Sequence, residues 1–142
     1  AEAIVPRVQL LFGHADFALR ASDVALVASG TATLEAAMLG CPQVVSYRVS
    51  KTTAFIVMRK LTSPYVSLPN ILANDWCVPE LLQDAATPEA LESALCGLID
   101  QPRLRAKTQE AYAQMADALK PPISDAGDPL ALAVLAQMRC QA

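Results

Sequence analysis

The stretch VASGTATLEAAMLGCPQVVSYRV, Val27–Val49, contains the change in residue pattern that decides the fold. An apolar run ends at Ser29-Gly30-Thr31, a segment with helical spacing follows, and after Pro42 the chain becomes rich in β-branched residues. A switch between the strand and helix patterns at a short polar junction is typical of α/β proteins. The stretch therefore predicts two strands of a parallel sheet with a helix between them.

The same alternation extends outward from this stretch. We expect strands or short extended pieces at 8–12, 23–28, 43–49 and 65–68. We expect helices between them at 15–22, 31–39 and 52–61. Beyond Pro79 only helices are indicated, at 80–83, 88–99, 102–119 and 130–138. For the helix expected at 88–99, Thr87 provides a cap and Pro88 a favourable first residue. This order predicts an α/β fold with a parallel sheet, helices on both faces and further helices at the C-terminal end.

Composition limits the function classes. A chain of 142 residues with 54% hydrophobic content and 5 glycines is expected to form one globular domain. A net charge of −3 argues against nucleic-acid binding, and no apolar run is long enough to span a membrane. The four cysteines have no C-x-x-C spacing and one histidine beside them, so we expect reduced thiols of a cytosolic protein and no metal site. Because the chain begins at Ala1, we expect it to be a piece of a longer protein.

Ser29-Gly30-Thr31 is the first candidate binding site. In a doubly wound sheet, ligands bind where a strand ends and a helix begins. Free backbone N–H groups and the positive end of the helix dipole favour an anion there. Gly30 allows close approach of a phosphate, and the hydroxyls of Ser29 and Thr31 add donors.

Glu35 narrows the kind of anion. It follows Thr31 by four residues and so shares its helix face. A carboxylate there would repel inorganic phosphate but would accept hydrogen bonds from a ribose diol, which favours a nucleoside diphosphate. The alternative is an ordinary capped helix with a solvated glutamate.

A second polar cluster lies between Ser67 and Gln83. Asn70 is expected at the end of a short strand, facing the same crevice as Ser29, and Glu80 and Gln83 are expected on one face of the next helix. Turn propensity explains Asn70 equally well, and simple solvation explains Glu80 and Gln83.

Three motifs, taken in their order along the chain, resemble those of a known protein family. They are ASGTATLEAAMLGCPQVVSYRV (Ala28–Val49), YVSLPNILA (Tyr65–Ala73) and VPELLQ (Val78–Gln83). Together they resemble the C-terminal half of bacterial lipid-A-disaccharide synthases. The resemblance implies the C-terminal, Rossmann-like domain of a GT-B glycosyltransferase. Such enzymes join UDP-2,3-diacylglucosamine to 2,3-diacylglucosamine 1-phosphate without a metal or cofactor, giving UDP and the β-1,6-linked lipid A disaccharide.

The resemblance also implies roles for individual residues. Seven residues are expected to bind the donor: Ser29, Gly30, Thr31, Glu35, Arg48, Asn70 and Gln83. The first three would meet the diphosphate and Glu35 the ribose, while Asn70 and Gln83 would border the sugar or the nucleotide. Arg48 would add a cation for the phosphates, or is a surface arginine. Gln43 and Asn74-Asp75 depart from the family pattern, where an apolar residue and a glycine are usual.

The expected organisation has three parts. Residues 1–119 form the donor-binding domain, 120–129 a proline-rich linker, and 130–142 a C-terminal helix that packs on another domain or on a second subunit. The acceptor pocket and the catalytic base are expected in an N-terminal half that this chain lacks, so we assign no base and expect the chain alone to be inactive. His14 is interpreted as a loop residue.

Partners and location follow from the same resemblance. We expect the two acylated substrates, the N-terminal acceptor domain, a homodimer as one option, and a peripheral position on the cytoplasmic face of the inner membrane of Gram-negative bacteria. Residues 52–61, TTAFIVMRKL, fit a membrane-surface helix or a buried helix with a basic end. Two other functions stay open: a UDP-N-acetylglucosamine 2-epimerase-like enzyme and a non-catalytic nucleotide-binding module.

Overall fold

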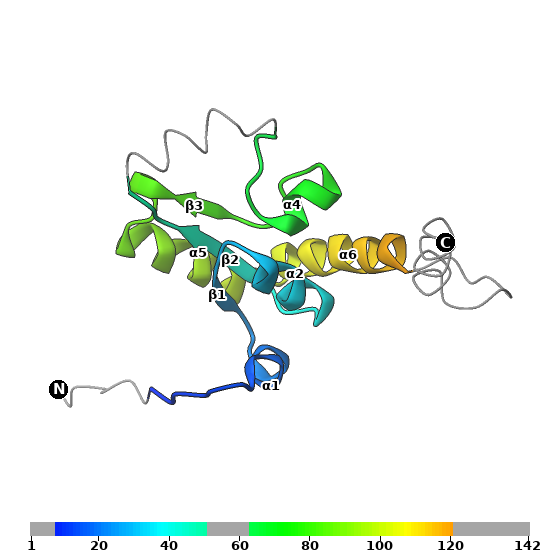
Figure 1. Ribbon diagram of the computed structural model, residues 1–142, viewed down its shortest axis with the longest axis horizontal. Coiled ribbons are helices and arrows are strands. Elements are labelled where there is room, and N and C mark those ends of the chain that lie inside the picture. Colours follow the sequence, from blue (N-terminus) through cyan, green and yellow to red (C-terminus); the bar gives the residue numbers. More distant parts are fainter. Residues whose placement is uncertain (1–7, 51–62, 121–142) are drawn as a thin grey trace, which may run out of the picture.

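The centre of the molecule is a sheet of three parallel strands (Figure 1). A computed structural model describes residues 8–50 and 63–120. The strands are β1 (Ala25–Ala28), β2 (Gln43–Tyr47) and β3 (Glu80–Leu82), in that spatial order. Ala28 lies opposite Ser46, and Tyr47 lies opposite Leu82. Because the strands are parallel, their carboxyl ends meet at one edge of the sheet, and the predicted α/β fold is confirmed.

The described α-helices are α1 (Ala15–Ala21), α2 (Thr31–Met38), α4 (Leu68–Ala73), α5 (Pro88–Asp100) and α6 (Pro102–Leu119). Of these, α2, α5 and α6 pack against β2. One core cluster joins Ala37 of α2, Val45 of β2, and Tyr112 and Met115 of α6. Val44 points to the opposite face by strand alternation and is also fully buried, and α5 contacts β2. Helices therefore cover both faces of the sheet at its central strand, β2.

The ends of α2 and α5 follow the local sequence closely. After α2, Gly40 has φ +72°, its N–H donates to the Ala37 carbonyl at 3.0 Å, and the Cys41 N–H donates to the Ala36 carbonyl at 2.9 Å. This pair of bonds is the Schellman arrangement, in which a left-handed glycine ends the helix. At the start of α5, the Thr87 hydroxyl accepts the Ala90 N–H at 3.2 Å, which confirms the predicted cap.

The predicted strand at 8–12 is wrong. Residues 8–11 have no regular secondary structure, and the side chains of Val8 and Phe12 are 79% and 84% exposed. A strand needs a neighbour to accept its backbone hydrogen bonds, and none of the described strands pairs with this segment.

Two assignments around Pro69 and Glu80 are also corrected. The extended piece predicted at 65–68 is wrong, because Leu68–Ala73 forms helix α4. Pro69 fits both assignments, since proline is tolerated in the first turn of a helix as well as at the end of a strand. Residues 80–83, predicted as helix, form β3 and the start of a 3₁₀ turn, Gln83–Ala85. Pairing with β2 outweighs the local helical preference of this short segment. The helix expected at 52–61, most of the 120–129 linker and the helix at 130–138 lie outside the described residues.

Candidate functional site

The first turn of α2 has a fixed backbone. Gly30 precedes the helix with φ +143° and ψ −163°, a conformation that residues with a Cβ rarely adopt. Its carbonyl accepts two hydrogen bonds from buried Thr33, from the hydroxyl at 2.7 Å and from the N–H at 3.1 Å. These two hydrogen bonds fix the direction of the Gly30 C=O. In a trans peptide the C=O and the next N–H point in opposite directions, so the Thr31 N–H points away from the helix.

This turn can bind an anion. The first N–H groups of an α-helix have no acceptor within the helix, and the helix dipole is positive at this end. Gly30 and Thr31 are exposed, and Ser29 is half-buried. Nothing lies within 4 Å of the position a Gly30 Cβ would take, so the backbone here is open to a ligand. Glu35, one helical turn further along, is exposed as well.

Three of the predicted segments converge on one edge of the sheet. Ser29 follows β1, Arg48 follows β2 and Gln83 follows β3, and these are the carboxyl ends of neighbouring parallel strands. The Gln83 Oε1 accepts the Val49 N–H at 3.4 Å, which ties the segment after β3 to the segment after β2. Gln83 has φ +52°, a left-handed conformation unusual for glutamine, and Arg48 is exposed.

Asn70 lies in a different place from the one predicted. It belongs to α4 rather than to a strand end, and its side chain is fully buried. Its Nδ2 donates to the Val78 carbonyl at 2.9 Å and to Glu80 Oε1 at 2.8 Å. Its Oδ1 accepts the N–H groups of Cys77 and Val78, each at 2.9 Å. Contact with a donor stays a prediction for Asn70, whereas its bonds to the β3 segment are observed.

Glu80 is a residue whose role sequence reasoning missed. Its carboxylate accepts the Val66 N–H at 3.0 Å, the Ser67 N–H at 2.8 Å and the Ser67 hydroxyl at 2.7 Å, in addition to Asn70. Glu80 and Gln83 do not share a helix face, because Glu80 opens β3 and Gln83 follows it. The carboxylate instead holds the loop before α4 against the sheet. A partly buried carboxylate that accepts two successive amides leaves no local sequence signal.

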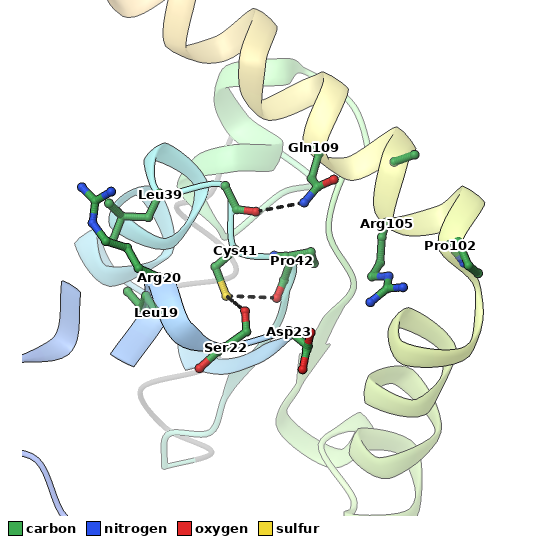
Figure 2. Close-up of a pocket in the computed structure, with 12 residues that line it drawn as sticks. Leu19, Arg20, Ser22, Asp23, Leu39, Cys41, Pro42, Pro102, Arg105 and Gln109 are labelled. Carbon is green, nitrogen blue, oxygen red and sulfur yellow. Dashed lines mark hydrogen bonds between the residues drawn. The ribbon is translucent and has the colours of Figure 1, made fainter. Parts of the chain in front are cut away.

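A separate cavity of about 380 Å³ lies at the opposite, amino-terminal end of the strands (Figure 2). Its lining includes Arg20, Asp23, Cys41, Arg105 and Gln109. The Gln109 Nε2 donates to the Gly40 carbonyl at 3.4 Å across one wall. None of the seven predicted donor residues lines this cavity.

The cysteines of the described residues are free thiols. Burial raises the pKa of the Cys41 thiol and, as the largest of several causes, that of the Cys77 thiol, while Cys96 is exposed. Within residues 8–50 and 63–120, no three His, Cys, Asp or Glu side chains form a group that could hold a metal ion. No described helix is both long and apolar enough to cross a bilayer.

Comparison with known proteins decides the family. The family model described as lipid-A-disaccharide synthetase matches residues 2–134. The chain belongs to the lipid-A-disaccharide synthase family. This is a glycosyltransferase family of lipid A biosynthesis. The family membership expected from the three motifs is thereby confirmed.

Individual relatives agree. Lipid-A-disaccharide synthase of Chromobacterium violaceum is 46% identical over 133 residues, 94% of this chain and 34% of the relative. The synthase of Dechloromonas aromatica is 49% identical over 107 residues, 75% of this chain and 28% of the relative. The synthase of Aromatoleum aromaticum is 59% identical over 88 residues, 62% of this chain and 22% of the relative. The chain thus spans about a third or less of the length of these relatives.

Proposed function

We propose that the chain is the C-terminal, donor-binding part of a lipid-A-disaccharide synthase. It would bind UDP-2,3-diacylglucosamine, and the whole enzyme would transfer the 2,3-diacylglucosamine to 2,3-diacylglucosamine 1-phosphate, forming the β-1,6-linked disaccharide and UDP. Family membership supports the class of reaction. The observation that supports binding of the UDP-sugar is the first turn of α2. It is exposed at the carboxyl edge of the sheet, and the hydrogen bonds from Thr33 to the Gly30 carbonyl fix its backbone.

The α2 turn would bind the diphosphate. The N–H groups of Thr31 and Ala32 would donate to its oxygens, together with the hydroxyls of Ser29 and Thr31. Arg48, at the end of the neighbouring strand, would add a positive charge. As the glycosidic bond to UDP breaks, negative charge grows on the leaving diphosphate. These N–H groups, hydroxyls and the Arg48 side chain would therefore bind the transition state more strongly than the ground state. The proposal involves no metal ion or cofactor.

Glu35 and Gln83 would hold the rest of the donor. The Glu35 carboxylate accepts hydrogen bonds from the ribose diol, because it lies one turn from the helix end that holds the diphosphate. Gln83 uses its Oε1 for the Val49 N–H, which leaves its amide NH₂ to donate to the sugar or the nucleotide. Asn70 would act through α4 and β3, because its polar atoms already have partners there.

The remaining parts of the reaction belong to the rest of the enzyme. We assign no general base in this chain and expect the acceptor pocket and the base in an N-terminal domain. Because both substrates carry acyl chains, we propose that the whole enzyme works at the cytoplasmic surface of the inner membrane. Assembly into a homodimer stays a prediction.

Titration of the chain with UDP, followed through backbone amide resonances, tests the donor site. We expect the largest shifts at Gly30, Thr31 and Glu35, and little change at Gly40 and Cys41 beside the separate cavity. Inorganic phosphate should need a much higher concentration, because it lacks the ribose that Glu35 binds. Shifts centred on the cavity, or equal affinity for phosphate and UDP, would refute the proposed site. Conversion of UDP-N-acetylglucosamine to its 2-epimer would favour the epimerase alternative.

A further inference from the structure

Gln43 is a buried amide that core stability does not explain. It opens β2, its side chain is fully buried, and its Oε1 has no hydrogen-bond partner among the described residues. A buried polar atom without a partner costs free energy, which an apolar side chain of similar size would avoid. The amide must therefore contribute something other than the filling of space.

The other atom of this amide makes two bonds. Gln43 Nε2 donates to the Thr33 carbonyl at 2.8 Å and to the Tyr112 hydroxyl at 3.1 Å. Thr33 lies in the first turn of α2, and Tyr112 lies on α6, fully packed in the core cluster with Val45. Gln43 thus connects three elements that are distant in the sequence.

The connection continues to the exposed turn. Thr33 holds the Gly30 carbonyl through both its hydroxyl and its N–H, as described above. A continuous series of hydrogen bonds therefore runs from Tyr112 through Gln43 and Thr33 to Gly30. It ends at the peptide whose N–H, that of Thr31, faces away from the helix. No other described side chain bonds to the Thr33 carbonyl.

We propose that Gln43 and Tyr112 are positioning residues for donor binding. They hold the first turn of α2 so that its N–H groups are already aimed at a diphosphate before the nucleotide arrives. Neither residue touches the ligand. The identity of that ligand rests on the proposed function, whereas the hold on α2 is a property of the chain with or without nucleotide. Preorganised donors lose less entropy on binding, so loosening the turn should weaken affinity.

Two variants and one matched control test the inference. Gln43→Met keeps the volume and removes the amide, and Tyr112→Phe removes only the hydroxyl. Thr108→Val is the control, because Thr108 is also buried on α6 and makes one hydrogen bond, to the Cys77 carbonyl at 3.2 Å, with no link to α2. Three quantities are measured on each: the thermal midpoint, hydrogen exchange of the Thr33 amide without nucleotide, and the Kd for UDP.

In Gln43→Met we expect exchange at the Thr33 amide to accelerate and the Kd for UDP to rise, each by roughly three- to tenfold, the effect of one lost hydrogen bond. The thermal midpoint should stay near that of the unchanged chain, because the unpaired oxygen is lost too. Tyr112→Phe should change both quantities in the same direction but less, since the bond from Gln43 to Thr33 remains. Thr108→Val should lower the midpoint and leave both quantities unchanged.

Unchanged exchange at Thr33 in both Gln43→Met and Tyr112→Phe would overturn the inference. Changes that merely follow the thermal midpoint, as judged against Thr108→Val, would overturn it too. If the unchanged chain binds no UDP, that result counts against the proposed function, and the exchange comparison alone decides the positioning role. If Gln43→Met does not fold, Tyr112→Phe supplies the same comparison.

Discussion

At the scale of single residues, Glu35 offers the sharpest test of the ligand. Replacing Glu35 by Gln removes the charge but keeps the shape, so the charge-assisted hydrogen bond that we propose to the ribose diol would be lost. We expect UDP binding to weaken by about 1 to 3 kcal/mol. Stability should barely change, because Glu35 is exposed. Isothermal titration with UDP measures the effect.

Glu92 supplies the control for this substitution. It is an exposed glutamate on α5, and Glu92→Gln changes the net charge by the same amount. It should leave UDP affinity unaltered. Equal affinities of the Glu35 and Glu92 variants would make Glu35 an ordinary solvated helix residue.

Tyr112 gives a prediction on pH. Burial raises the pKa of its phenol well above the ordinary value of 10, outweighing the opposing hydrogen bond from Gln43. Above pH 10 the unfolded chain therefore loses this proton while the folded chain keeps it. Stability falls with pH by up to about 1.4 kcal/mol per unit for this group, until its folded pKa is reached. Tyr112→Phe should remove that part of the slope when urea unfolding is compared between pH 9 and 11. An identical slope in the variant would contradict the assignment.

At the scale of elements, the buried amide of Asn70 bonds α4 to the β3 segment. Asn70→Ala removes partners from the Val78 carbonyl, two backbone N–H groups and Glu80. We expect a loss of about 2 to 4 kcal/mol in the free energy of unfolding, measured with urea. Asn74→Gly, at the exposed left-handed end of α4, should be nearly neutral. If Asn70→Ala left stability unchanged and abolished only turnover of the whole enzyme, Asn70 would be a donor contact after all.

Gly30, before α2, and Gly97, within α5, differ in how far their conformation requires glycine. Gly30→Ala forces an alanine into φ +143° and should destabilise the chain by about 1 to 3 kcal/mol and weaken UDP binding, because the α2 turn must shift. Gly97→Ala, in the last turn of α5, should instead stabilise by about 0.5 to 1 kcal/mol, since a Cβ there meets only the Gln101 Nε2 at 4.0 Å. Thermal unfolding of both variants measures the contrast. Similar effects of the two substitutions would remove the conformational argument.

The elements that sequence could predict are those whose signals are local. Helix α2 has its glycine before the first residue and another after the last, and β1 and β2 are apolar runs beside it, so their positions follow from adjacent residues. β3 is different, because Glu80–Leu82 becomes a strand only through pairing with β2. The hydrogen bond between Gln43 and Tyr112 joins residues 69 positions apart, and no local sequence pattern predicts it. The predicted donor residues Ser29, Arg48 and Gln83 reach one edge because parallel strands bring their carboxyl ends together, whereas Asn70 was misplaced with the secondary structure of its segment.

At the scale of the whole molecule, the chain covers 34% or less of the relatives described above. The described residues nevertheless contain a core of their own, in which Val45 and Met115 pack together with Tyr112. Nucleotide binding and group transfer should therefore separate. Under the proposed function, the chain would supply the hydrogen-bond donors for a diphosphate, and we assign it no base for the acceptor hydroxyl.

We predict that this chain alone binds UDP weakly and transfers no sugar. Binding is weak because a nucleotide held at an exposed sheet edge keeps part of its surface in water until a second domain closes over it. The measurement combines UDP titration with an assay of disaccharide formation from UDP-2,3-diacylglucosamine and 2,3-diacylglucosamine 1-phosphate. A whole relative, such as the Chromobacterium violaceum synthase, serves as the positive control. Disaccharide formed by this chain alone would mean that it contains the group that activates the acceptor. That result would refute the proposal that this chain only binds the UDP-sugar and that another domain activates the acceptor.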